Sequence, residues 1–121
     1  MTIQEVFNKI AKHLLAQNHQ ATADGGELCR YHVYEDGKLV SACAVGCLID
    51  REKYDWRIEG YAVHNSVVQD VLEESGVDLE DDSICDLLIT LQEIHDEHEP
   101  VEWHHQLSKV AYDYHLDSSV L

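Results

Sequence analysis

Apolar residues recur three and four positions apart in several segments, and this spacing limits the fold more than any other feature of the sequence. The first such segment runs from Ile3 to Leu15 and follows directly on Thr2-Ile3-Gln4-Glu5. A Thr followed three residues later by Glu is typical of a capping box, in which each side chain accepts the other residue's backbone N–H. Side chains three and four apart share a helix face, so this segment predicts an amphipathic helix over about residues 3–17.

Three later segments show the same helical spacing. Asn65 or Ser66 can cap a helix that ends at Ser75-Gly76, and Asp81-Asp82-Ser83 opens another. Glu99-Pro100 ends that helix and begins the last one, because proline is tolerated in a first turn. The predicted buried stripes are Val67, Val68, Val71 and Leu72; Ile84, Leu87, Leu88, Leu91 and Ile94; and Val101, Trp103, Leu107, Val110, Ala111 and Tyr114.

One hairpin provides the only good evidence for strands. Residues 29–34 and 38–42 are rich in strand-forming side chains and flank the turn sequence Glu35-Asp36-Gly37. The polar residues 18–27 predict a loop, and residues 43–49 fit either a short buried helix or a buried strand. The sequence therefore predicts a mainly α (α+β) fold of four to five short helices and one small β-hairpin, in a single domain over residues 1–121.

Charge is distributed very unevenly along the chain. The formal net charge is −16, from 24 acidic and 8 basic residues. The 51 residues from 58 to 108 contain 14 acids and no Lys or Arg. Such a surface repels nucleic acid and anionic membranes and attracts basic protein surfaces, so we expect neither direct nucleic-acid binding nor membrane binding.

The acids of the two central helices are predicted to lie opposite their apolar stripes. Carboxylates along a helix surface can imitate the phosphate spacing of duplex DNA, so a DNA-binding protein could dock there by the same electrostatics. Acids that only keep the protein soluble, or a salt-adapted proteome, would explain the same composition. The predicted partner-binding residues are Glu73, Glu74, Asp78, Glu80, Asp81, Asp82, Asp86, Glu93, Asp96, Glu97 and Glu99.

The four cysteines allow a structural, a metal-binding or a catalytic role. The chain shows no secretory signal and no apolar run long enough to span a bilayer, so we expect a cytoplasmic protein with reduced thiols. Cys43 and Cys47 lie in SACAVGCLID, among small apolar residues, and core filling is the main interpretation. No cofactor is expected. The weaker metal candidates are Cys29, Cys43, Cys47 and His95.

A small metal- or thiol-dependent enzyme is the alternative function. In this hypothesis Cys43 or Cys47 lies near His95, and Asp96 or Glu99 orients the imidazole. A third hypothesis, a ligand pocket, uses the aromatic residues Tyr54, Trp56 and Tyr61, which more often cover a small core.

Three segments give the chain a resemblance to known sequences. They are CAVGCLID, the Glu59-Gly60 pair, and LLITLQEIHD at 87–96 before Trp103. They resemble a group of small uncharacterised proteins in phage and bacterial genomes. The similarity covers about residues 10–115, and the matching positions are Cys43, Gly46, Cys47, Tyr54, Gln92, His95, Asp96 and Trp103. The resemblance implies a phage-type protein. With the acidic surface, it predicts an inhibitor of a host nucleic-acid-handling or defence protein, such as a restriction or CRISPR-type system.

Overall fold

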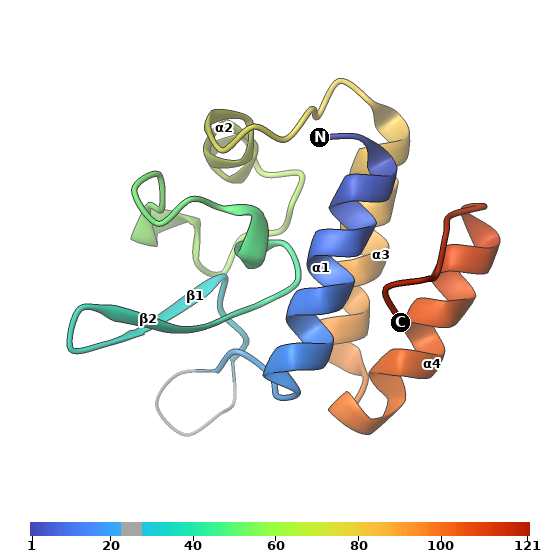
Figure 1. Ribbon diagram of the computed structural model, residues 1–121. Coiled ribbons are helices and arrows are strands. Elements are labelled where there is room, and N and C mark those ends of the chain that lie inside the picture. The colour runs from blue at the N-terminus through green and yellow to red at the C-terminus, as the bar shows by residue number, and fades with distance from the viewer. Residues whose placement is uncertain (23–27) are drawn as a thin grey trace.

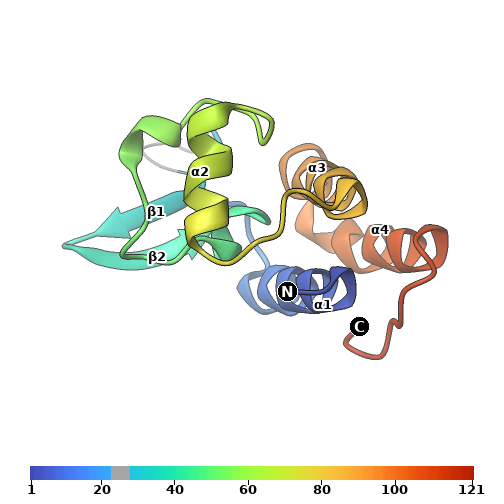
Figure 2. The same cartoon turned by 90° about the horizontal axis from the view of Figure 1, so that it is seen from above.

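Four α-helices and one two-stranded antiparallel hairpin form the described part of the chain, which confirms the predicted mainly α fold. The computed structural model describes residues 1–22 and 28–121. Helices α1 (Ile3–Gln17), α3 (Asp82–Glu97) and α4 (Pro100–Asp113) pack together on one side (Figure 2). The hairpin and helix α2 (Ser66–Glu74) lie on the other side (Figure 1). The predicted loop over residues 18–27 falls partly outside the described residues.

Each helix begins where its capping residue predicts. At α1, the Thr2 hydroxyl accepts the Glu5 N–H at 3.1 Å, and the Glu5 carboxylate accepts the Thr2 N–H at 2.9 Å. Asn65 rather than Ser66 caps α2, because its side-chain oxygen accepts the Val67 N–H at 2.9 Å. These bonds satisfy backbone donors that have no partner inside the helix.

The three packed helices contribute the largest part of the core. Their apolar stripes face one another, and the central residues of each stripe are fully buried, as the helical spacing predicts. The central residues are Phe7, Ile10 and Leu14 of α1, Leu87, Leu88 and Leu91 of α3, and Trp103 and Leu107 of α4. Within the described residues, none of the helices is both long enough and apolar enough to cross a lipid bilayer.

Val101 is an exception to the predicted stripe of α4. Its side chain is 86% exposed, whereas Trp103, two residues later, is fully buried. Two residues turn an α-helix by roughly 200°, so Val101 and Trp103 cannot share a face. The prediction that Val101 belongs to the core was therefore wrong, and so was that for Val67 of α2, which is 40% exposed.

The hairpin has the predicted turn but a later first strand. Strand β1 (His32–Glu35) pairs with β2 (Lys38–Ala42), so that His32 lies opposite Ala42. Asp36 and Gly37 both have positive φ, at 52° and 75°, which suits the two-residue turns favoured in hairpins. Cys29, predicted to start the strand, instead forms an isolated bridge with Thr22.

The segment after the hairpin is packed into the core. Residues 43–45 are buried, and the short 3₁₀ helix η1 (Gly46–Leu48) follows them. A Cβ atom at Gly46 would lie only 1.9 Å from the backbone oxygen of Tyr31. Glycine is therefore required here because the two backbones touch. This close contact confirms that SACAVGCLID is an internal packing segment.

Candidate functional site

A groove with a volume of about 450 Å³ lies beside the outer face of α3. Three segments distant in sequence form it: residues 29–31 before β1, the loop 60–64 before α2, and the second half of α3, together with Cys43. From α3, the lining residues are Ile89, Gln92, Glu93, Asp96 and Glu97. We call this hollow the α3 groove.

The acids of α3 lie on one side of the helix. Their spacing places them within about a third of its circumference, opposite the buried stripe. All are exposed, and among the described residues none of them forms an ion pair with a Lys or Arg side chain. These five residues, Asp82, Asp86, Glu93, Asp96 and Glu97, are named the acidic face.

The other predicted partner-binding residues are exposed but do not line the groove. Glu73 and Glu74 end α2, Asp78 and Glu80 lie in the following loop, and Glu99 precedes α4. Asp81 is the N-cap of α3, and its carboxylate accepts the Ser83 N–H at 2.9 Å. The groove thus brings together three of the eleven, which are Glu93, Asp96 and Glu97.

The Asp96 carboxylate is held in a fixed position. Its Oδ1 atom accepts hydrogen bonds from His95 Nδ1 at 2.7 Å and from the Gln92 amide at 2.9 Å. Burial raises the carboxylate's pKa, but the hydrogen bonds from His95 and Gln92 outweigh this effect, so the pKa of Asp96 is lowered overall. The side chain is 38% exposed and therefore presents an ionised carboxylate to the groove.

His95 positions this carboxylate from inside the core. Its imidazole is fully buried and stacks on Trp103, with ring centroids 5.5 Å apart. The Nε2 atom accepts the backbone N–H of Ala21 at 3.0 Å, so the ring proton is on Nδ1, which donates to Asp96. Both ring nitrogens are therefore used within the protein.

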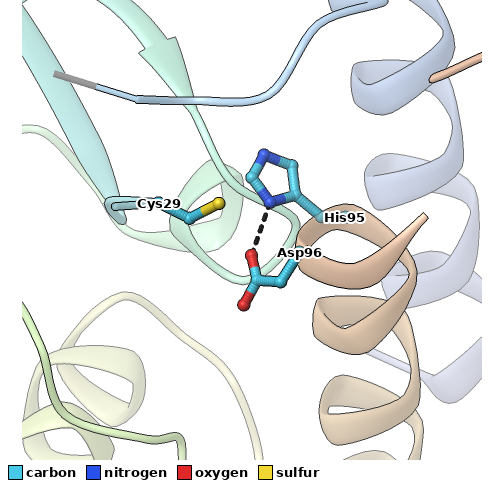
Figure 3. Close-up of side chains that lie close together, drawn as sticks. All are labelled: Cys29, His95 and Asp96. Carbon is cyan, nitrogen blue, oxygen red and sulfur yellow. Dashed lines mark hydrogen bonds and ion pairs between the residues drawn. The ribbon is translucent and has the colours of Figure 1, made fainter. Parts of the chain in front are cut away.

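Cys29 completes a small cluster at the end of the groove (Figure 3). Its sulfur and the ligand atoms of His95 and Asp96 all lie within 4.8 Å of one another. A metal bound at His95 Nδ1 would move the ring proton to Nε2, where it would point at the Ala21 N–H. Burial and the Asp96 charge raise the pKa of the Cys29 thiol to about 11, so it resists deprotonation. Both features count against metal binding.

The thiol-enzyme hypothesis located the wrong cysteine beside His95. Cys29, not Cys43 or Cys47, is the thiol that the structure groups with His95 and Asp96. The Cys43 sulfur accepts the Gly46 N–H at 3.3 Å, and the Cys47 thiol donates to the Ala44 oxygen at 3.1 Å. Burial raises the pKa of both thiols, and the reactive species is the thiolate. The enzyme alternative stays a prediction, and none of these three cysteines provides it with an activated thiolate.

Sequence reasoning gave no structural role to Gln92, which it named only as a matching position of the resemblance. Gln92 links the core to the site, because its oxygen accepts the Val45 N–H at 3.0 Å while its amide donates to Asp96. Its position four residues before Asp96 is the sequence signal that could have identified it. In the loop 60–64, Tyr61 was named in the ligand-pocket hypothesis and does line the groove, whereas Tyr54 and Trp56 do not. The meeting of this loop with α3 has no sequence signal, since only tertiary packing brings them together.

Comparison with known proteins assigns neither a family nor a function to this chain. No protein-family model, no curated protein and no solved structure matches this chain. The candidate function therefore depends on the geometry and charge of the acidic face and the α3 groove.

Proposed function

We propose that this protein binds a basic protein surface through the acidic face of α3, and that its target is a nucleic-acid-handling protein. The observation that carries the proposal is the arrangement of α3, whose carboxylates share one exposed side opposite the core. The exposed side of this helix also carries no Lys or Arg, so its own charge is entirely negative.

The negative electrostatic potential of this face is little reduced, because few positively charged side chains lie near it. No Lys or Arg occurs between Arg57 and Lys109, and Arg57 itself pairs with Asp55 at 2.8 Å. Arg30 lines the α3 groove, but three carboxylates line it too, so the surface stays predominantly negative. Such a surface raises the rate of encounter with an oppositely charged partner and selects against wrong partners. A protein that holds DNA phosphates through Lys and Arg presents the complementary surface.

Inhibition of the target follows from this mode of binding. A protein bound over a nucleic-acid-binding surface blocks access of the nucleic acid to the same Lys and Arg residues. The resemblance to small phage proteins supports a host protein, such as a defence nuclease, as the target class. The protein would then act by occupancy and would need no chemistry of its own.

The test is capture of partners from a bacterial lysate at two ionic strengths. We expect the captured protein to be basic and to be released as salt rises. A variant with Asp86, Glu93 and Glu97 changed to Lys should lose it. Asp81 is left unchanged because it caps α3.

The matched control changes three other exposed acids, Glu52, Asp70 and Asp113, to Lys, and so shifts the net charge equally. We expect this control to retain more binding than the acidic-face variant. Equal loss in both variants, or capture that does not depend on salt, would show that the acidic face is not the binding surface.

A further inference from the structure

We infer that the α3 groove is a binding site for one arginine side chain of the basic partner. This inference rests on the proposed function and assigns a specific recognition point within that surface. The groove is concave and its volume of about 450 Å³ falls in the range of sites that bind small groups. Its lining contains charged, polar and apolar side chains, as recognition of a long cationic side chain requires.

The charge of the lining favours a cation. Three carboxylates, Glu93, Asp96 and Glu97, face one guanidinium, that of Arg30. The Cys29 thiol adds no negative charge, because its pKa is raised to about 11 by burial and by Asp96. The excess of two negative charges inside a hollow is less screened by salt than the charge of a flat surface.

Asp96 provides the anchoring contact. His95 and Gln92 both bond its Oδ1 atom, and the Cys29 thiol is a further, weaker donor to the carboxylate. Among the described residues no nitrogen or oxygen donor bonds Oδ2. A carboxylate with one oxygen held by the protein can accept a ligand N–H at the other without reorganising. His95 and Gln92 are therefore positioning residues, and Asp96 is the residue that contacts the ligand.

The remaining walls suit the rest of an arginine side chain. Tyr61, Val63 and Ile89 line the groove with apolar surface, against which the methylene stem can pack. The Tyr61 ring is 56% exposed, and it offers a face on which a guanidinium can stack.

Arginine fits this lining better than lysine. Its planar guanidinium has five donors in a fixed fork, so it can bond Asp96 and a neighbouring carboxylate together. The ammonium group of lysine is more strongly hydrated and loses more on entering a partly apolar groove.

The experiment uses the whole chain labelled with ¹⁵N and the probe N-acetyl-L-arginine methylamide, followed by NMR. We expect the largest shifts at the Gln92 side-chain amide and at residues 60–64 and 93–97. The lysine analogue should bind several-fold more weakly, and the citrulline analogue, which lacks the charge, should not bind. The Asp96→Asn variant should weaken arginine binding about tenfold, as expected for loss of a charged hydrogen-bond partner.

The matched control is Glu73→Gln, which removes one charge outside the groove and should change binding less than about twofold. A second variant, Glu93→Gln, removes only the charge of an exposed side chain that makes no hydrogen bond among the described residues, so it should leave the fold intact. We expect it to weaken binding by about threefold, in line with a partly exposed charge pair.

Two results would overturn the proposal that the groove binds arginine. Equal weakening by Asp96→Asn and Glu73→Gln, or shifts spread evenly along α3, would show diffuse attraction by the acidic face and leave the proposed function standing. Equal affinity for the arginine and citrulline analogues would refute recognition of a cation. Arginine binding in the groove without any salt-dependent basic partner would instead count against the proposed function alone.

Discussion

Replacement of Gly46 by alanine tests the close backbone contact between Gly46 and Tyr31. The added Cβ would lie 1.9 Å from the Tyr31 oxygen and 2.7 Å from the Tyr31 carbonyl carbon. Both atoms belong to backbone, so no side-chain rotation can relieve the clash. One of the two segments must therefore move.

The Tyr31 segment is held on several sides, which sets the magnitude. Its N–H donates to Glu59 at 2.9 Å, its hydroxyl to the Tyr61 oxygen at 2.5 Å, and its carbonyl accepts the Cys43 N–H at 3.2 Å. Overpacking costs about 1–3 kcal/mol, and weakening one of these bonds adds about 1 kcal/mol. We expect Gly46→Ala to lower the unfolding free energy by about 3 kcal/mol.

The assay is urea unfolding followed by circular dichroism, supported by the thermal midpoint. A loss of 3 kcal/mol should lower the Tm by about 12 °C in a domain of this size. The control is Gly76→Ala, where the new Cβ meets no atom within 4 Å and the cost comes from the φ of 94°. That change should cost about 1 kcal/mol. A Gly46→Ala protein as stable as Gly76→Ala would refute the proposed close contact.

Three further predictions concern buried titratable groups and thiols. Burial lowers the pKa of His13 and of His32 below the ordinary 6.5, so the unfolded chain binds more protons in mildly acidic solution. Urea unfolding at several pH values should therefore show stability that is highest near pH 7–8 and falls as pH drops below about 6.5, and constant stability down to pH 5 would contradict this. Burial raises the pKa of Cys47 to about 12, and burial together with the Asp96 charge raises that of Cys29 to about 11. Both thiols should therefore react slowly with a disulfide reagent at pH 8 and rapidly after unfolding. Fast reaction of these two thiols in the folded protein would refute their assignment as protected thiols. Cys43→Ser should cost about 1–3 kcal/mol because it buries a hydroxyl in an apolar site, and lost partner binding at unchanged Tm would show a functional thiol instead.

The elements that depend on local interactions could be predicted from the sequence. Thr2, Asn65 and Asp81 cap their helices as expected, because a capping bond spans two or three residues. The turn at Asp36-Gly37 was identified for the same reason. The two wrong core assignments, Val67 and Val101, came from counting apolar residues without their angle around the helix.

The candidate site could be predicted only in part. The acids of α3 fall opposite its apolar stripe by helical periodicity alone, and all the predicted partner-binding acids are exposed. The contact of His95 with an acid was also predicted, with Asp96 or Glu99 as the candidates, and Asp96 is the one bonded to it. The thiol beside this pair was assigned wrongly, because the cysteine that comes near α3 depends on the path of residues 28–31.

The sequence by itself determined the helices, the hairpin turn and the one-sided charge of α3, since each depends on residues a few positions apart. The tertiary structure decided that residues 29–31, 60–64 and the end of α3 meet around a groove, and that Asp96 is held there by His95 and Gln92. Contacts between segments this distant in sequence follow from how the whole core packs, and no local pattern records that packing.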